Sequence, residues 1–163
     1  MKKICIISDT HGYIDDIMVS YFKNCDEVWH AGDIGDLKIC DKINKKSFLR
    51  AVHGNIDDYL IRSEYPEYIF FKCEELKVLM IHIGGYPRKY SKKGIELIKK
   101  YKPNIFICGH SHILKVINDK KMNLIHINPG AIGKSGFHKL RTMITLEIKN
   151  EKMFNMNVIE FIR

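Results

Sequence analysis

Apolar residues recur along this chain with two different periods, and the changes between them mark the predicted elements. In the first third, short apolar runs typical of buried strands alternate with segments that have helical spacing. The predicted strands are Lys2–Ser8, Glu27–His30 and Phe48–His53, and the predicted helices are Asp15–Phe22 and Asp36–Asn44. This β-α-β-α-β order is typical of a parallel or mixed sheet with helical crossovers.

The rest of the chain is richer in strands. After a loop, the pattern predicts a hairpin around Glu74 and Glu75, then one helix, one strand and four alternating segments typical of antiparallel strands. These elements are Tyr68–Lys72, Lys77–His82, the helix Lys92–Lys100, Ile105–Cys108, Leu114–Asn118, Leu124–Ile127, Thr142–Ile148 and Asn155–Phe161. The order predicts an α/β fold, with two sheets packed face to face and helices outside. The length fits a single domain over residues 1–163.

Polar side chains follow five of the predicted strands, at the point where each strand ends. They are Asp9 and His11, Asp33, Asn55, His82, and His110 with His112, in chain order. In an α/β sheet, the loops at the carboxyl ends of the strands converge on one crevice. Each residue alone has an ordinary explanation as a helix cap, a turn former or a packed histidine. Their repeated position favours one shared site.

The chemistry of these seven side chains predicts a metal site. Imidazole, carboxylate and amide oxygen suit manganese, iron, zinc or nickel, and no thiolate is offered. Seven ligands are too many for one tetrahedral zinc, but they suit two ions that share a bridging carboxylate. Two ions about 3.5–4 Å apart form the clamp used for in-line displacement at phosphorus. Glycines beside the ligands would let the backbone pass close to the ions. They are Gly12, Gly32, Gly54 and Gly109.

Composition and charge narrow the possible partners. The formal net charge is +8, but the lysines occur as scattered pairs without interleaved aromatic residues. This pattern favours a solvated basic surface over a nucleic-acid groove or a nuclease. No apolar run is long enough to predict a membrane span. The five cysteines lack CxxC spacing, which predicts reduced thiols and a cytoplasmic protein.

Six motifs in order carry a resemblance to a known family. They are SDTHG, HAGD, VHGNID, the strand-end His82, GHSH and INPGA, within residues 1–133. Together they resemble the calcineurin-like metallophosphoesterases, and most closely their small single-domain branch. That branch contains bacterial and archaeal phosphodiesterases and a eukaryotic retromer scaffold subunit. The resemblance implies an αββα sandwich of two sheets flanked by helices.

The resemblance also implies how the ligands divide between two ions. One ion would take Asp9, His11, Asp33 and His112, and the other would take Asp33, Asn55, His82 and His110. Asp33 would bridge, and Asp33, Asn55 and His110 would act in catalysis. A hydroxide that bridges the ions would attack the phosphorus. The expected cofactors are two divalent ions, manganese first, with iron, zinc, nickel or cobalt as alternatives.

The chain departs from the family pattern at two positions. Many phosphatases of the family have a histidine after the GN pair that helps to protonate the leaving oxygen, and this chain has Ile56 there. Relatives commonly continue with Gly-His after the histidine at position 82, but this chain continues with Ile83 and Gly84, so the second histidine is missing.

Three further residues are candidates for roles around the site. We expect Arg88 or its neighbour Lys89 to hold a substrate phosphate, with a solvated loop charge as the alternative. His53 is a second candidate to face the phosphate. Asp57 is expected either to hydrogen-bond a metal-ligating histidine or to be a plain turn residue.

The sequence therefore predicts a metal-dependent hydrolase of phosphoesters, with phosphodiesters favoured over phosphomonoesters. Its substrate would be a small phosphoester, and small members of the branch often form homodimers. The alternative is a protein-binding scaffold module that keeps the same fold. Retention of all seven candidate ligands favours the enzyme.

Overall fold

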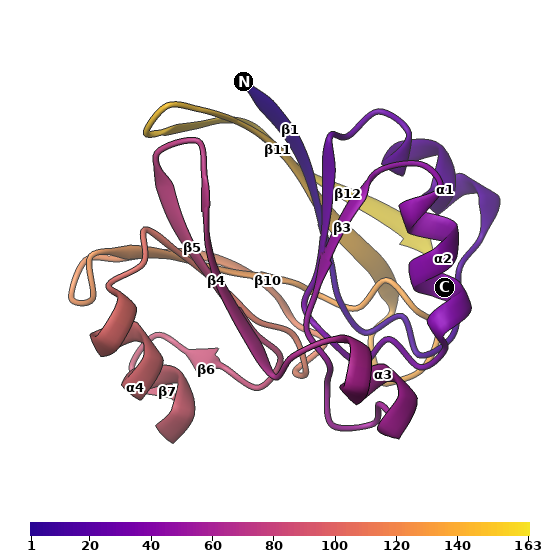
Figure 1. Ribbon diagram of the computed structural model, residues 1–163, viewed down its shortest axis with the longest axis horizontal. Helices are drawn as coiled ribbons and strands as arrows, with labels where there is room; N and C mark the ends of the chain where they lie inside the picture. The colour runs from indigo at the N-terminus through magenta and orange to yellow at the C-terminus, as the bar shows by residue number, and fades with distance from the viewer.

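Two five-stranded sheets form the centre of the protein in a computed structural model that describes residues 1–163 (Figure 1). The first sheet consists of β1 (Lys2–Ile7), β2 (Glu27–His30), β3 (Phe48–Ala51), β11 (Leu140–Lys149) and β12 (Lys152–Ile162). The second consists of β4 (Tyr68–Cys73), β5 (Leu76–Ile81), β8 (Ile105–Ile107), β9 (Leu114–Asp119) and β10 (Leu124–Pro129). The strand orders are β12-β11-β1-β2-β3 and β4-β5-β8-β10-β9.

Three neighbouring strands of each sheet pair in parallel, and this brings their carboxyl ends to one edge of that sheet. β1, β2 and β3 pair in parallel in the first sheet, and β5, β8 and β10 do so in the second. The other four strands, β11, β12, β4 and β9, pair in the antiparallel sense. All five strands that precede the candidate ligands belong to the parallel sets.

Helices cover the outer faces of both sheets. These helices are α1 (Asp16–Phe22), α2 (Leu37–Asn44), α3 (Tyr59–Glu64) and α4 (Lys92–Tyr101). α1 and α2 lie beyond the first sheet and α4 lies beyond the second (Figure 1). The layers therefore follow the order helix, sheet, sheet, helix that the sequence predicts. No helix has the length and apolar composition that crossing a membrane would require.

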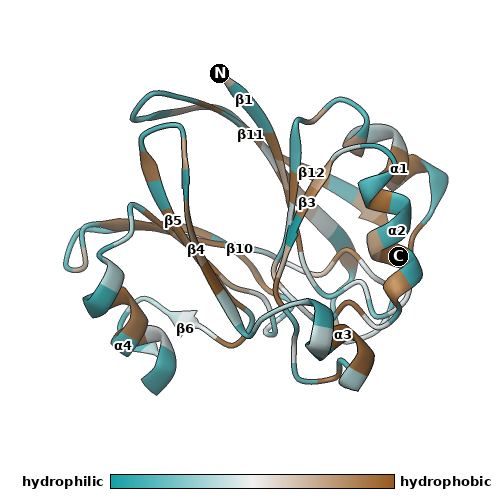
Figure 2. Ribbon diagram, viewed as in Figure 1, coloured by the Kyte–Doolittle hydropathy of each residue, from teal (hydrophilic) through white to brown (hydrophobic).

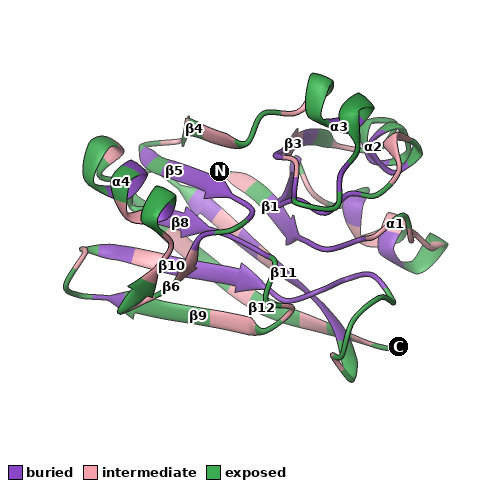
Figure 3. Ribbon diagram, turned by 90° about the horizontal axis from the view of Figure 1, so that it is seen from below, coloured by how far each residue is buried: buried purple, intermediate pink, exposed green.

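Strand alternation explains this layering. Ile4 and Ile6 of β1 enter the apolar core between the sheets, while Cys5 and Ile7 enter the core beneath α1 and α2. A strand buried on both faces is expected at the centre of a sheet whose two faces are covered, which is the position of β1. Brown apolar segments run along β4, β5 and β10 in Figure 2, and Figure 3 shows β5, β8 and β10 buried beside the more exposed edge strand β9.

The structure differs from the predicted elements in two places. The loop predicted before Tyr68 contains the short helix α3, of which only Ile61 is buried. One buried residue leaves no apolar periodicity for sequence reasoning to detect. The segment after His82 forms a two-stranded hairpin of β6 (Gly85–Tyr86) and β7 (Lys89–Tyr90). The cysteines are all free, as predicted.

Candidate metal centre

The loops that follow the parallel strands hold their polar residues in an unusual backbone conformation. Five candidate ligands have a positive φ, the left-handed region that costs most L-residues about 1–2 kcal/mol. They are Asp9 (55°), His11 (46°), Asp33 (55°), His110 (68°) and His112 (57°). Such strain persists only where the surrounding structure enforces it, and it concentrates at functional sites.

The first group of side chains comes from the loops after β1 and β8. His112 Nε2 lies 3.2 Å from Asp9 Oδ1, and His11 Nε2 lies 3.9 Å from the same oxygen. The two imidazole Nε2 atoms are 3.4 Å apart. Asp9 is fully buried, whereas both histidines are partly accessible. One carboxylate oxygen and two ring nitrogens thus converge on one point that solvent can reach.

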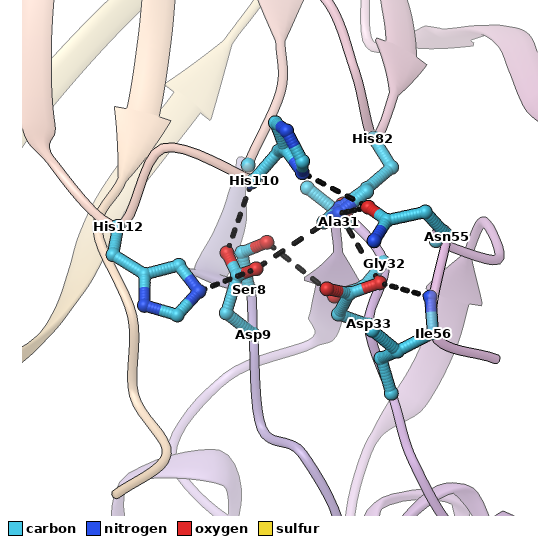
Figure 4. A network of polar contacts seen from close by, with 12 residues as sticks. Ser8, Asp9, Ala31, Gly32, Asp33, Asn55, Ile56, His82, His110 and His112 are labelled. Atoms are coloured by element: carbon cyan, nitrogen blue, oxygen red, sulfur yellow. Dashed lines mark hydrogen bonds and ion pairs between the residues drawn. The ribbon is translucent and has the colours of Figure 1, made fainter. Parts of the chain in front are cut away.

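The second group comes from the loops after β2, β3, β5 and β8. Asn55 Oδ1 lies 3.1 Å from His82 Nε2 and 2.9 Å from His110 Nδ1. His82 Nε2 also lies 3.2 Å from Asp33 Oδ1. In Figure 4, Asn55 and His82 lie on one side of the two aspartates and His112 lies on the other. Four donors of the second predicted ion are therefore adjacent.

Asp33 lies between the two groups. Its Oδ1 faces His82 of the second group, and its Oδ2 lies 3.6 Å from His11 Nε2 of the first. The backbone N–H of Ile56 donates to Oδ1 at 3.1 Å and holds the carboxylate in place. A carboxylate with one oxygen toward each group is placed as a bridging ligand would be.

Three observations indicate that these side chains are suited to hold two divalent ions. Asp9 Oδ1 is buried and has no hydrogen-bond partner, which is costly unless a cation or another donor occupies the space. A Cβ on Gly54 would lie 2.0 Å from Asp33 Oδ1, and one on Gly109 would lie 2.9 Å from Asp9 Oδ2. The donors are imidazole, carboxylate and amide, without thiolate, as borderline metals prefer. The seven predicted ligands lie together, and their binding of metal remains a prediction.

His82 and Asp33 form an ion pair when no metal is bound. Burial alone would lower the pKa of His82, but its hydrogen bond to Asp33 and the nearby charge of Asp9 raise it above its ordinary value. Burial alone would raise the pKa of Asp33, but its bond to His82 lowers it. A metal ion at this ring would therefore compete with a proton.

Neighbouring groups fix the orientation of the rings. His82 Nδ1 donates to the carbonyl oxygen of Ala31 at 2.7 Å, which directs Nε2 toward the cluster. Fully buried His30 accepts from the N–H of Gly32 and donates to Thr10 Oγ1. Burial lowers the pKa of His30 to about 4. His30 therefore packs as a neutral support for the loops.

The hydrogen bond expected between Asp57 and a ligand histidine is not found. The carboxylate of Asp57 instead accepts the backbone N–H groups of Ile34, Gly35 and Gly54 at 2.7–3.1 Å. It ties the loop after β2 to the loop after β3. Asp57 therefore positions Asp33 and Asn55 through the backbone.

The structure separates the two predicted substrate-binding residues. His53 lines a cavity beside Asn55 and His82, where it can still face a substrate. Arg88 lines a different cavity of about 740 Å³ with Lys99 and no candidate ligand. A role for Arg88 in holding a substrate phosphate stays a prediction, and the residue lies in the turn between β6 and β7.

Two residues near the cluster were missed by sequence reasoning. The ring of His138 lies 5.3 Å from the ring of His112, and His138 Nε2 donates to the carbonyl of Gly133. Arg62 on α3 donates to three carbonyls in residues 54–57. His138 belongs to no motif, and Arg62 lies on the helix that the pattern did not reveal.

Comparisons with known proteins agree with this geometry. The chain is 31% identical to a probable metallophosphoesterase of Methanocaldococcus jannaschii, over 78% of this chain and 67% of that protein. It superposes on Vps29 of Entamoeba histolytica, solved in complex with Zn²⁺, with a TM-score of 0.75 and 15% identity, over 98% of each chain. It superposes on a novel archaeal phosphodiesterase with a TM-score of 0.68 and 21% identity, over 96% of this chain and 99% of that one.

The family assignment rests on most of the sequence. Residues 1–151 match the calcineurin-like phosphoesterase superfamily domain. That span includes β1 to β11 and all seven candidate ligands. The chain is therefore a member of the calcineurin-like phosphoesterase superfamily.

Proposed function

We propose that this protein is a phosphodiesterase that works with two divalent metal ions, manganese first among them. The observation that carries the proposal is the position of Asp33, with one oxygen toward each of two groups of donors. When bound, the two ions supply the positive charge that lowers the pKa of an attacking water and neutralises the phosphate oxygens.

The side chains of the protein prepare the site for that charge. Asp33 holds the two donor groups at a fixed separation, and its bond from Ile56 N–H keeps its orientation. Asn55 Oδ1 and His110 Nδ1 lie 2.9 Å apart on the exposed side of the second group. A phosphate oxygen of the substrate would approach the site from this side. We assign catalytic roles to these three residues on this basis.

The residue that follows Asn55 predicts a preference for esters with activated leaving groups. Ile56 is 46% exposed beside the cluster, and its side chain has no proton to donate. An alkoxide leaving group needs a proton as the bond breaks, and such help is worth about 10²–10⁴-fold. A nitrophenolate leaves without it. We expect aryl diesters to be cleaved faster than alkyl monoesters.

The alternative is a scaffold module that binds other proteins. The structural similarity to Vps29 is compatible with this alternative. At 15% identity, however, that similarity concerns the fold alone. Against a purely structural role stand the strained φ angles of five ligands and the buried, unpartnered Asp9 Oδ1. A scaffold needs neither feature.

The proposal is tested with metal-free protein, added Mn²⁺ and bis-p-nitrophenyl phosphate. We expect Mn²⁺-dependent turnover that falls by about 10²-fold or more in Asp33→Asn, because both ions lose a charged ligand. Asp41→Asn, which changes an exposed charge on α2, is the matched control. Turnover by Asp33→Asn near that of the wild type, with full metal content, would contradict the bridging role. Full metal content without turnover in the wild type would favour the scaffold.

A further inference from the structure

A cavity opens from the metal-ligand cluster on the side of Asn55 and His82. Its volume is about 410 Å³, and it lies between α3 and the start of α4. Three cationic side chains line it, from Arg62, Lys92 and Lys93, against one acidic residue, Glu67. Because the cavity and the cluster share ligand residues, a molecule bound at the metals reaches these cations without leaving the site.

Arg62 is held in place before any ligand arrives. Its Nε donates to the carbonyl of Asp57 at 2.7 Å, and its Nη2 donates to those of Gly54 and Asn55 at 3.2 and 3.1 Å. Its Nη1 has no partner. A guanidinium fixed by its backbone contacts loses little further freedom when it binds an oxyanion.

Lys92 and Lys93 stand where a helix disfavours positive charge. They occupy the first turn of α4, which has no acidic residue, although the helix dipole favours anions there. The start of α4 is anchored, because Ser91 N–H donates to the carbonyl of Gly84 and Ser91 Oγ donates to that of Ile83. An anion in the cavity would offset both the dipole and the two lysine charges.

The opposite side of the cluster lacks cationic side chains and exposes apolar ones. A cavity of about 450 Å³ beside His110 and His112 is lined by Ile113 and Phe137 and has no lysine or arginine. The side chain of Phe137 is fully exposed. In Figure 4, His112 lies on the side of Asp9 away from Asn55, so the two cavities flank the cluster. The two sides would therefore accept chemically different arms of a diester.

We propose that Arg62, Lys92 and Lys93 form a subsite for a second phosphate group, carried on one arm of the diester substrate. The inference rests on the proposed function and adds the substrate class. The natural substrate is then a diester with one arm that bears a further phosphate and another arm that is uncharged. Specificity for that arm resides in α3 and α4, outside the metal ligands.

A matched substrate pair tests the subsite. The p-nitrophenyl diester of thymidine monophosphate is compared with the same compound carrying a second phosphate on the sugar. We expect wild-type kcat/KM to favour the phosphorylated compound by about fivefold, as two exposed ion pairs would give. The preference should shrink in Lys92→Met/Lys93→Met, which keeps only Arg62 of the three cations, and at high salt. Lys99→Met/Lys100→Met makes the same charge change at the other end of α4 and should keep it. The subsite is refuted if the wild type cleaves both compounds with equal kcat/KM, or if Lys92→Met/Lys93→Met keeps the wild-type preference. In either case, turnover of the two diesters would still support a phosphodiesterase.

Binding without metal separates the two proposals further. Calorimetry with EDTA-treated protein should show that thymidine bisphosphate binds more tightly than thymidine monophosphate. In the Lys92→Met/Lys93→Met variant, the ratio of the two affinities should fall by about fivefold. In the Lys99→Met/Lys100→Met variant, this ratio should stay at the wild-type value. If neither diester is hydrolysed by the metal-loaded protein, the proposed function fails and this binding difference still decides the subsite. Equal binding of the two nucleotides by the wild type would refute it.

Discussion

The substitution Gly54→Ala tests whether metal binding and turnover depend on the position of Asp33, because an added Cβ would collide with that residue. A Cβ at position 54 would lie 2.0 Å from Asp33 Oδ1 and 2.4 Å from Asp33 N. Ordinary van der Waals contact begins near 3.4 Å, so Gly54→Ala must move Asp33 or its own loop by about 1.4 Å. Gly54 does not have a left-handed φ, so contact and not backbone strain is the perturbation.

The expected effect follows from the two contacts of Asp33. A displacement of about 1 Å at a reacting centre can cost about 10²-fold in rate. We expect Gly54→Ala to lose about 10²-fold in kcat/KM for bis-p-nitrophenyl phosphate. Both Mn²⁺ equivalents should bind more weakly in calorimetry, because the two donor groups share the displaced carboxylate.

Gly130→Ala is a control for general destabilisation. Its Cβ would lie 2.1 Å from Thr142 Oγ1, a comparable clash that involves no candidate ligand. This variant should lower Tm, yet it should keep metal affinity. Wild-type metal affinity and turnover in Gly54→Ala, with Tm lowered as in Gly130→Ala, would refute the reasoning.

Three further predictions address proton donation to the leaving group, the pH dependence of folding stability, and the release of metal at low pH. Ile56→His should raise kcat/KM for an alkyl phosphomonoester by about tenfold or more, relative to an aryl diester; if the wild type already cleaves both equally, His53→Gln should identify the acid. Burial with no hydrogen-bond partner lowers the pKa of His126 to about 4, whereas an unfolded histidine titrates near 6.5. Between these pH values the unfolded chain binds a proton that the folded chain does not, so stability falls as pH drops through this window, by up to about 3 kcal/mol. In urea unfolding, His126→Leu should reduce this pH dependence but not abolish it, because buried His30 has a similarly lowered pKa; an unchanged dependence would contradict the assignment. Mn²⁺ content measured after dialysis should fall below about pH 7, because the ligand histidines must be neutral to bind and the pKa of His82 is raised; retention of both ions at about pH 5 would count against a histidine-rich site.

The layers and the ligand cluster could be predicted because strong local signals mark them. The strands of the two sheets are apolar runs of ordinary length, and each ligand follows such a run directly. Parallel pairing then brings the ends of β1, β2 and β3 together, as the β-α-β order requires. Asp9 and His112 follow strands of different sheets, and they meet at 3.2 Å because the two sheets pack against each other through a shared core.

The surroundings of the cluster could not be predicted, because they depend on short elements with weak patterns. α3 buries only Ile61, so nothing in the sequence placed Arg62 beside Asn55. Arg88, in the turn between β6 and β7, lines a cavity that contains no candidate ligand, and no sequence pattern marked this hairpin. The carboxylate of Asp57 binds amides from two loops, a contact set by tertiary packing and by no local motif.

A single titration tests the central claim most directly. Metal-free protein receives Mn²⁺ in steps while bound metal and hydrolysis of bis-p-nitrophenyl phosphate are measured together. The position of Asp33 between two donor groups predicts two bound equivalents per chain, with turnover that rises as the second site fills. Saturation at one equivalent, or two equivalents without turnover, would contradict a two-metal phosphodiesterase.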